Sequence, residues 1–278
     1  MPYGDAIGIH RTMSDLIHLW KPFLLGIVEG LTEFVPVSST GHLIIAGHFL
    51  RYGSPEFEII IQLGAMLALT WCTSERILTL SGHLGLRPEG RPFLWKVGLA
   101  FLPAATVGFL THDVIEAYLF HPGFVAAMLV AGGILILRID RPGDRSGLED
   151  LEKISFAQAI AIGFGQCLAL LPGVSRSGAT IVTGLVAGLS RAASTEFSFF
   201  LALPTMYAAC FYTIFKARER LVDELGVGMA VGLLAAYLSS LVVIRAFLKF
   251  VQTNSLRLFG WYRIVLGLVL LAFLGLSI

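Results

Sequence analysis

One stretch of this chain carries paired carboxylates, hydroxyls and an imidazole within otherwise apolar sequence. It covers residues 26–44 and contains Glu29 and Glu33, four positions apart. On a helix that spacing places both carboxylates on one face, where they could hold a divalent cation or transfer a proton. Because ionisable groups in apolar surroundings are costly unless they are used, we interpret the pair as functional.

The same stretch continues past Pro36 with small polar residues. Ser38, Ser39 and Thr40 open a second helical limb, where hydroxyls cap free N–H groups and where those N–H groups can also bind an anion. Ser38 and Thr40 are therefore candidates for binding phosphate. Capping does not account for His42, which lies three positions after Ser39 and so on the same helical face. Either Ser39 or His42 could act as nucleophile or base.

A second stretch, residues 163–181, reads as an imperfect copy of the first at a spacing of 137 positions, with Gln166 in the place of Glu29. It offers glycine for close backbone approach, a guanidinium for bidentate binding of phosphate, and hydroxyls one helical turn apart. A site that combined both stretches would have carboxylates for a cation and an arginine for an anionic substrate. The predicted phosphate-binding residues of this copy are Gly173, Ser175, Arg176, Ser177 and Thr180.

The composition predicts an all-α polytopic membrane protein. Of the 278 residues, 56% are hydrophobic and 14% charged, and the mean hydropathy is +0.79; ordinary soluble domains carry about 25% charged residues. A net charge of +1 gives no basic surplus for nucleic acid. The three cysteines stand singly in apolar runs, which favours packing over disulfides or a metal cluster.

Six apolar runs are candidates to cross a bilayer, which needs about 20 residues. Two further segments, 23–50 and 156–187, are interrupted at their centres by Pro, Gly, Ser and charged residues. Each limb of about 13 residues would extend only about 20 Å, so we expect re-entrant helical hairpins. The predicted spans lie near residues 57–73, 97–111, 123–139, 196–215, 227–248 and 258–277.

We expect a single integral membrane domain, residues 1–278, made of two repeats, 22–140 and 155–278, after an N-terminal surface or interfacial segment, 1–21. Each repeat has one hairpin and three spans. Because three crossings are odd, the second repeat would enter from the opposite face. This inverted-topology repeat would bring the hairpin tips together near the midplane.

The distribution of Lys and Arg predicts the orientation. One side collects more of these cations, Arg257 and Arg263 among them, and is expected to be cytoplasmic. Both termini would then lie outside, and the site would open to the periplasmic side. Glycine-rich spans pack as readily within a chain as between chains, so a homo-oligomer also remains possible.

The two motifs together resemble the undecaprenyl-pyrophosphate phosphatase family of bacteria, also called bacitracin-resistance proteins. The resemblance runs from about residue 22 to the C-terminus, through residues 29–42 and 172–180. It implies an inner-membrane enzyme that removes the terminal phosphate of undecaprenyl pyrophosphate, recycles the lipid carrier for peptidoglycan synthesis and uses Mg²⁺ or Ca²⁺. By this resemblance the metal or acid/base residues are Glu29 and Glu33, the nucleophile candidates are Ser39 and His42, and the phosphate clamp is Ser175, Arg176, Ser177 and Thr180.

Two other functions fit the same residues less well. A lipid-phosphate flippase or ion-coupled anion transporter would also use inverted repeats with broken helices, but has no need for Ser39 and His42 beside a phosphate clamp. A phosphatidic-acid-phosphatase type of lipid phosphatase is disfavoured because no His and Asp follow Ser175-Arg176 at the required distance. We therefore expect the diphosphatase.

Overall fold

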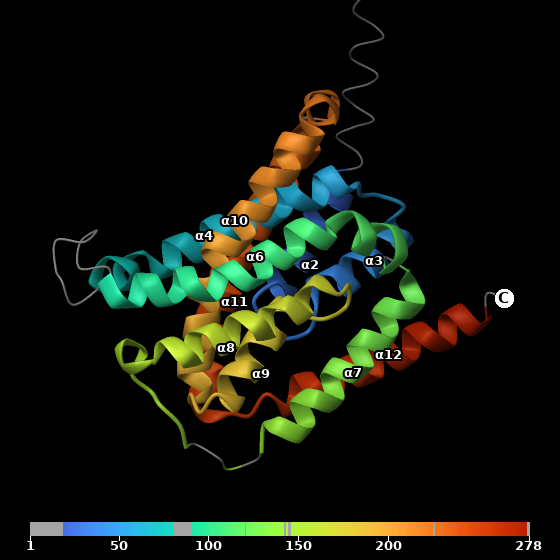
Figure 1. Cartoon of the computed structure of the whole chain (residues 1–278). Coiled ribbons are helices and arrows are strands. Elements are labelled where there is room, and N and C mark those ends of the chain that lie inside the picture. Colours follow the sequence, from blue (N-terminus) through green and yellow to red (C-terminus); the bar gives the residue numbers. More distant parts are fainter. Residues whose placement is uncertain are drawn as a thin grey trace, which may run out of the picture.

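The computed structural model describes residues 19–80, 91–119, 121–141, 143, 146–224 and 226–276. Within these ranges the chain forms helices and no β-strand (Figure 1). The α-helices are α2 (Trp20–Thr32), α3 (Ser39–Leu50), α4 (Pro55–Leu80), α6 (Arg91–Leu119), α7 (Pro122–Ile139), α8 (Phe156–Cys167), α9 (Arg176–Val186), α10 (Arg191–Glu224), α11 (Val227–Thr253) and α12 (Arg257–Leu276). Two 3₁₀ turns, η2 (Leu151–Lys153) and η3 (Leu168–Leu170), flank α8.

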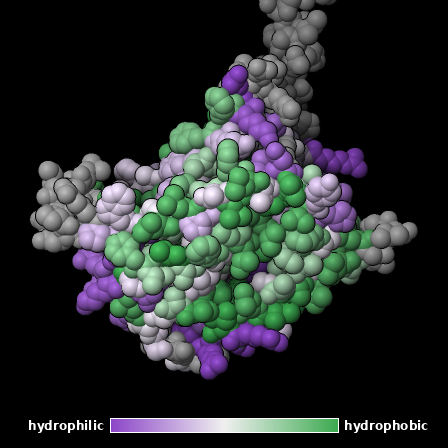
Figure 2. All heavy atoms as spheres, viewed as in Figure 1, coloured by the Kyte–Doolittle hydropathy of each residue, from purple (hydrophilic) through white to green (hydrophobic). Residues whose placement is uncertain are grey.

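The six predicted spans are confirmed. In the described part of the chain, six helices are long and apolar enough to cross a membrane: α4, α6, α7, α10, α11 and α12. Figure 2 shows apolar side chains in a broad band across one face, with polar side chains at its upper and lower margins. The protein is therefore a multi-pass membrane protein. The predicted segment 1–21 lies largely outside the described residues, and α2 begins at Trp20.

Two short helical hairpins occupy the predicted positions. The first hairpin comprises α2 and α3 joined by residues 33–38, and the second comprises α8, η3 and α9 joined by residues 171–175. Within each hairpin the two limbs pack against each other. The turn of the first contains Ser38 at φ +72°, and the turn of the second contains Gly173 at φ +92°. That these hairpins re-enter a membrane, and that the repeats are inverted, stay predictions.

Each hairpin packs against a span of the other predicted repeat. Helix α2 lies along α11, and α8 lies along α6. A Cβ added at Gly26 would lie 2.2 Å from the carbonyl oxygen of Gly232, and one added at Gly163 would lie 2.4 Å from that of Ala100. Gly26 and Gly163 are matched positions of the two copies, so the same glycine allows the same close approach in both hairpins.

Three further pairings close the bundle: α7 lies beside α12, α4 beside α10, and α9 against α10. The aromatic rings of Phe34 and Phe199 meet edge to face at 5.6 Å in the core between the first hairpin and α10. This contact fixes the chain immediately after Glu33. The bundle therefore holds both hairpin turns from several sides.

One expectation about charge is wrong. Arg263 was counted with the cations of the cytoplasmic loops, but it lies within α12 and is 1% exposed. Its guanidinium donates to backbone carbonyls, which is how a buried arginine can satisfy its N–H groups without water.

Candidate active site

The helix starts at the two hairpin turns place the predicted site residues. Ser38 is the N-cap of α3, with its Oγ accepting a long hydrogen bond of 3.5 Å from Gly41 N. Ser175 is the N-cap of α9, with its Oγ accepting a bond of 3.1 Å from Gly178 N. Because Ser39 and Arg176 are the first helical residues after these caps, both side chains are fixed at the turns.

Glu33 connects the two hairpins. Its Oε2 accepts a hydrogen bond of 2.5 Å from Ser39 Oγ, and its Oε1 accepts one of 3.2 Å from Arg176 Nη2. A carboxylate bonded to a serine hydroxyl at this distance can accept its proton. The structure therefore brings three of the predicted catalytic residues into one hydrogen-bonded chain.

Arg176 is held on its other side by α10. Its Nη1 donates to the carbonyl oxygen of Ser198 at 3.1 Å and to Ser198 Oγ at 3.3 Å. The side chains of Arg176 and Glu33 are only 11% and 5% exposed. Breaking a pair this buried leaves an uncompensated charge, which costs about 3–5 kcal/mol. Arg176 is therefore a fixed cation of the core rather than a surface arginine.

Glu29 lies one turn before Glu33 and is 1% exposed. Its backbone oxygen accepts a bond of 2.9 Å from Glu33 N, but its side-chain Oε1 has no hydrogen-bond partner among the residues that the structure describes. A buried carboxylate oxygen without a partner is costly unless a proton or cation satisfies it. In the described part of the chain, no group of three or more His, Cys, Asp and Glu residues gathers for a metal.

The ring nitrogens of His42 form hydrogen bonds with residues other than Ser39. Its Nδ1 is 2.7 Å from the carbonyl oxygen of Ser38, and its Nε2 is 2.6 Å from the hydroxyl of Tyr262. The two rings stack with 5.6 Å between centroids and 4° between planes. Sequence spacing placed Ser39 and His42 on one face, but the partner of Ser39 is Glu33 and the partner of His42 is Tyr262.

The predicted phosphate clamp is packed between the hairpins. Ser177 Oγ donates to the carbonyl oxygen of Val35 at 3.0 Å and is hydrogen-bonded to Ser175 Oγ at 2.9 Å. Thr180 Oγ1 lies 2.6 Å from Ser198 Oγ. These hydroxyls join the second hairpin to the first hairpin and to α10. Their binding of phosphate stays a prediction.

Gly173 and Thr40 complete the predicted set. A Cβ at Gly173 would meet the carbonyl oxygen of Val125 on α7 at 2.5 Å, so the close approach that glycine allows here is to a helix. Thr40 is half-buried in the first turn of α3. The structure thus places both residues at the hairpin turns.

Sequence reasoning missed Ser198, Tyr262 and Arg263, which surround the predicted site. Nothing in the local sequence of Ser198 distinguishes it from a packing residue. Arg263 did carry a signal, because it lies inside the predicted span 258–277, where an arginine needs a polar partner. Tyr262, its neighbour on α12, had no separate signal.

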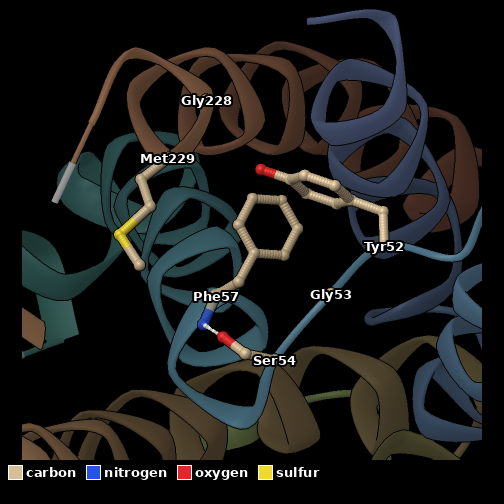
Figure 3. Close-up of a pocket in the computed structure, with 6 residues that line it drawn as sticks. All are labelled: Tyr52, Gly53, Ser54, Phe57, Gly228 and Met229. Atoms are coloured by element: carbon tan, nitrogen blue, oxygen red, sulfur yellow. Dashed lines mark hydrogen bonds between the residues drawn. The ribbon is translucent and has the colours of Figure 1, made fainter. Parts of the chain in front are cut away.

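A pocket of about 290 Å³ lies elsewhere, where the chain after α3 meets the starts of α4 and α11 (Figure 3). At the edge of this pocket, Phe57 N donates a hydrogen bond of 3.1 Å to Ser54 Oγ. Its six lining residues include none of the predicted site residues: they are Tyr52, Gly53, Ser54, Phe57, Gly228 and Met229. The candidate site is the hydrogen-bonded core at the hairpin turns.

Comparison with known proteins agrees with the motifs that form this core. A sequence model described as bacitracin resistance protein BacA matches residues 22–269. This range includes nearly all of the first hairpin, all of the second, five spans and most of α12. The chain belongs to the BacA family. The match begins at the boundary expected for the first repeat.

Curated members of the BacA family are similar over almost the whole chain. An undecaprenyl-diphosphatase of Nitrosomonas europaea is 50% identical over 261 residues, covering 92% of this chain and 95% of that protein. One from Bordetella pertussis is 46% identical over 285 aligned positions, covering 94% and 99%. Undecaprenyl-diphosphatase 3 of Acinetobacter baylyi is 44% identical over 259 residues, covering 92% and 97%.

Proposed function

We propose that this protein hydrolyses undecaprenyl pyrophosphate to undecaprenyl phosphate and inorganic phosphate. The observation that carries the proposal is the buried chain from Ser39 through Glu33 to Arg176, which joins a hydroxyl, a base and a cation across the two hairpins. The names of the similar BacA proteins support the same reaction and favour it over a flippase or transporter. The product would be the lipid carrier for peptidoglycan synthesis, and its recycling would confer bacitracin resistance.

In this mechanism Ser39 is the nucleophile. Its Oγ attacks the terminal phosphorus while its proton passes to Glu33, and the bond from that phosphorus to the bridging oxygen breaks, releasing undecaprenyl phosphate. Water then attacks the phosphorus of the phosphoserine and the bond to Ser39 Oγ breaks. Glu33 returns its proton to that oxygen, and both protons of the water leave with inorganic phosphate. The 2.5 Å bond between Ser39 and Glu33 supports this assignment over direct attack by His42.

Arg176 supplies positive charge where the transferred phosphoryl group would sit. In phosphoryl transfer most of the catalysis comes from positioning and from electrostatic stabilisation of the equatorial oxygens. The N-terminus of α9, capped by Ser175, adds N–H groups and the positive end of the helix dipole. For the guanidinium of Arg176 to bind phosphate, its Nη2 must donate to a phosphate oxygen in addition to Glu33 Oε1 or in place of it.

The orphaned Oε1 of Glu29 fits a divalent cation, Mg²⁺ or Ca²⁺. Glu29 and Glu33 would hold it. When bound, the cation would neutralise negative charge on the diphosphate. Within the described structure, the side-chain Oε1 of Glu29 is a buried oxygen available to a cation, one helical turn before Glu33.

We place the enzyme in the bacterial inner membrane with its site open to the periplasmic side, as the distribution of loop cations suggests. The burial of Arg263 removes one cation from the expected cytoplasmic side and leaves that side richer in Lys and Arg. The isoprenoid tail would lie among the apolar spans, where many large apolar side chains are exposed.

The test is phosphate release from undecaprenyl pyrophosphate by the purified protein in detergent, with and without chelator. Wild type should release phosphate in a cation-dependent way, and Arg176→Ala and Glu33→Ala should abolish release. Arg191→Ala is the matched control, because Arg191 forms an ion pair with Asp140 of similar burial, 10% and 2% exposed, away from the hairpin turns. Folded wild type without release on several polyprenyl diphosphates would refute the proposal.

A further inference from the structure

Arg263 bonds to both hairpin turns at once. Its Nη1 donates to the carbonyl oxygen of Pro36 in the first turn at 3.3 Å, and its Nη2 donates to that of Gly173 in the second turn at 3.0 Å. Its remaining bonds reach α7, from Nη2 to the carbonyl oxygen of Met128 at 3.2 Å and from Nε to that of Leu129 at 3.3 Å. One guanidinium thus joins α12, α7 and both turns.

The space around this guanidinium is made by glycine. A Cβ added at Gly132 of α7 would lie 2.2 Å from Arg263 Nη2, and one added at Gly178 of α9 would lie 3.4 Å from Nη1. Larger side chains at Gly132 would displace the arginine. The backbone is therefore shaped to admit a guanidinium between the two hairpins.

Among the described residues, no carboxylate forms an ion pair with Arg263. All four of its hydrogen bonds in the described structure end on backbone carbonyls, and the residue is 1% exposed. Burying a cation with only neutral acceptors is costly, and a span that merely needs packing would be better served by an apolar residue. This cost indicates a specific role.

We propose that Arg263 is a positioning residue for the site at the hairpin turns. By holding the carbonyls of Pro36 and Gly173, it sets the separation of the two turns and so lets Glu33 reach Arg176. Its effect on catalysis rests on the proposed diphosphatase function, whereas its effect on the separation of the turns does not. Arg263 does not touch the reacting atoms, since its N–H groups are directed to these carbonyls.

The matched control is Arg257 on the same helix. Its Nη1 donates to the carbonyl oxygen of Leu137 on α7 at 2.7 Å, so it also links α12 to α7, but within the described part of the chain it has no bond to either hairpin turn. Replacing each arginine by methionine removes hydrogen bonds between these two helices in both variants, two in Arg263→Met and one in Arg257→Met. Only Arg263→Met also releases the turns.

Activity is the first readout. Relative to Arg257→Met, we expect Arg263→Met to lower kcat about 100-fold, the effect of misplacing reacting groups by about 1 Å. KM should change less than about threefold, because the lipid tail still binds among the spans. Arg263→Lys should recover part of kcat, since lysine keeps the charge but not the planar fork of donors. Equal kcat in Arg263→Met and Arg257→Met would overturn the proposal.

The separation of the hairpins is the second readout and needs no substrate. Spin labels at Leu31→Cys and Leu168→Cys, both half exposed on opposite hairpins, report it by pulsed electron paramagnetic resonance after the three native cysteines are replaced. The distance distribution should be narrow in wild type and in Arg257→Met and broader in Arg263→Met. An unchanged distribution in Arg263→Met would overturn the proposal whatever the enzyme assay gives.

Two results separate this proposal from the proposed function. If wild type releases no phosphate but Arg263→Met broadens the distance distribution, the positioning role stands and the diphosphatase assignment fails. If wild type is active and Arg263→Met leaves both kcat and the distribution unchanged, the positioning role fails alone. Should Arg263→Met not purify as a folded protein, Arg263→Lys against Arg257→Lys gives the same two comparisons.

Discussion

Glu33 and Arg176 form a buried ion pair although 143 positions separate them in the sequence. Glu33 directly follows α2, the first limb of the first hairpin. Arg176 is the first residue of α9, the last limb of the second hairpin. The pair is therefore a direct measure of whether the two hairpin turns meet. It also holds the proposed base against the proposed phosphate-binding cation.

The losses of stability caused by removing each member of this pair should not add. We expect Arg176→Met to cost about 3 kcal/mol because it leaves Glu33 buried and charged. The double variant Glu33→Gln/Arg176→Met should cost less than the sum of the two single variants. Thermal unfolding of the four proteins in one detergent measures this coupling, and additive losses would show that the pair does not form.

Loss of the Ser39 hydroxyl should remove turnover while the fold remains. If Ser39 is the nucleophile, Ser39→Ala should lower kcat by more than about 10³-fold. Ser54→Ala is a matched control, because Ser54 also lies at a helix start, where its Oγ accepts from Phe57 N at 3.1 Å. A search for phosphoserine at position 39 by mass spectrometry after rapid quenching is the direct test. Near-normal turnover of Ser39→Ala would transfer the nucleophile's role to another group.

His42 and its tyrosine partner should differ in the size of their effects. His42→Ala should be severely impaired, because it removes the imidazole bonded to the carbonyl oxygen of Ser38, the residue before the proposed nucleophile Ser39. Tyr262→Phe should lose about fivefold in kcat, because it keeps the stacked ring and gives up one hydrogen bond worth about 1 kcal/mol.

The control for this pair is Tyr207→Phe. The hydroxyl of Tyr207 bonds to Thr70 Oγ1 at 2.9 Å between α10 and α4, so the change removes a similar bond elsewhere in the bundle. Initial rates at saturating substrate compare the three variants. Wild-type turnover in His42→Ala would exclude a role for this histidine in the reaction.

Glu29→Gln should leave the stability of the fold intact while it removes the dependence of phosphate release on a cation. Glutamine occupies the matched position of the second hairpin, where Gln166 Nε2 donates to Thr205 Oγ1 at 3.1 Å, so this hairpin fold accepts it. We expect an unchanged or higher melting temperature, because a buried acidic oxygen without a partner is removed. Phosphate release should fall and should no longer respond to added Mg²⁺ or Ca²⁺.

The response to cations is measured by titrating Mg²⁺ or Ca²⁺ into chelator-treated protein. Wild type should recover activity with a saturating dependence on the cation. The same dependence in Glu29→Gln would place the cation away from Glu29. An unresponsive wild type would show that the carboxylates act only as acid and base.

The sequence by itself determined the membrane class, the six spans and the two interrupted segments. These features follow from local properties, since the length of an apolar run and the position of Pro, Gly and Ser act on their own stretch of chain. The motif around Glu29 and Glu33 and the motif around Arg176 were recognisable for the same reason.

The tertiary structure alone decided which of these residues meet. Spacing along a helix suggested Ser39 with His42, whereas the turn of the first hairpin brought Ser39 to Glu33 and packing against α12 brought His42 to Tyr262. It also turned Arg263 from an expected loop cation into a buried link between both hairpin turns. Contacts between residues more than 100 positions apart depend on how whole helices pack, and no local pattern of residues specifies that packing.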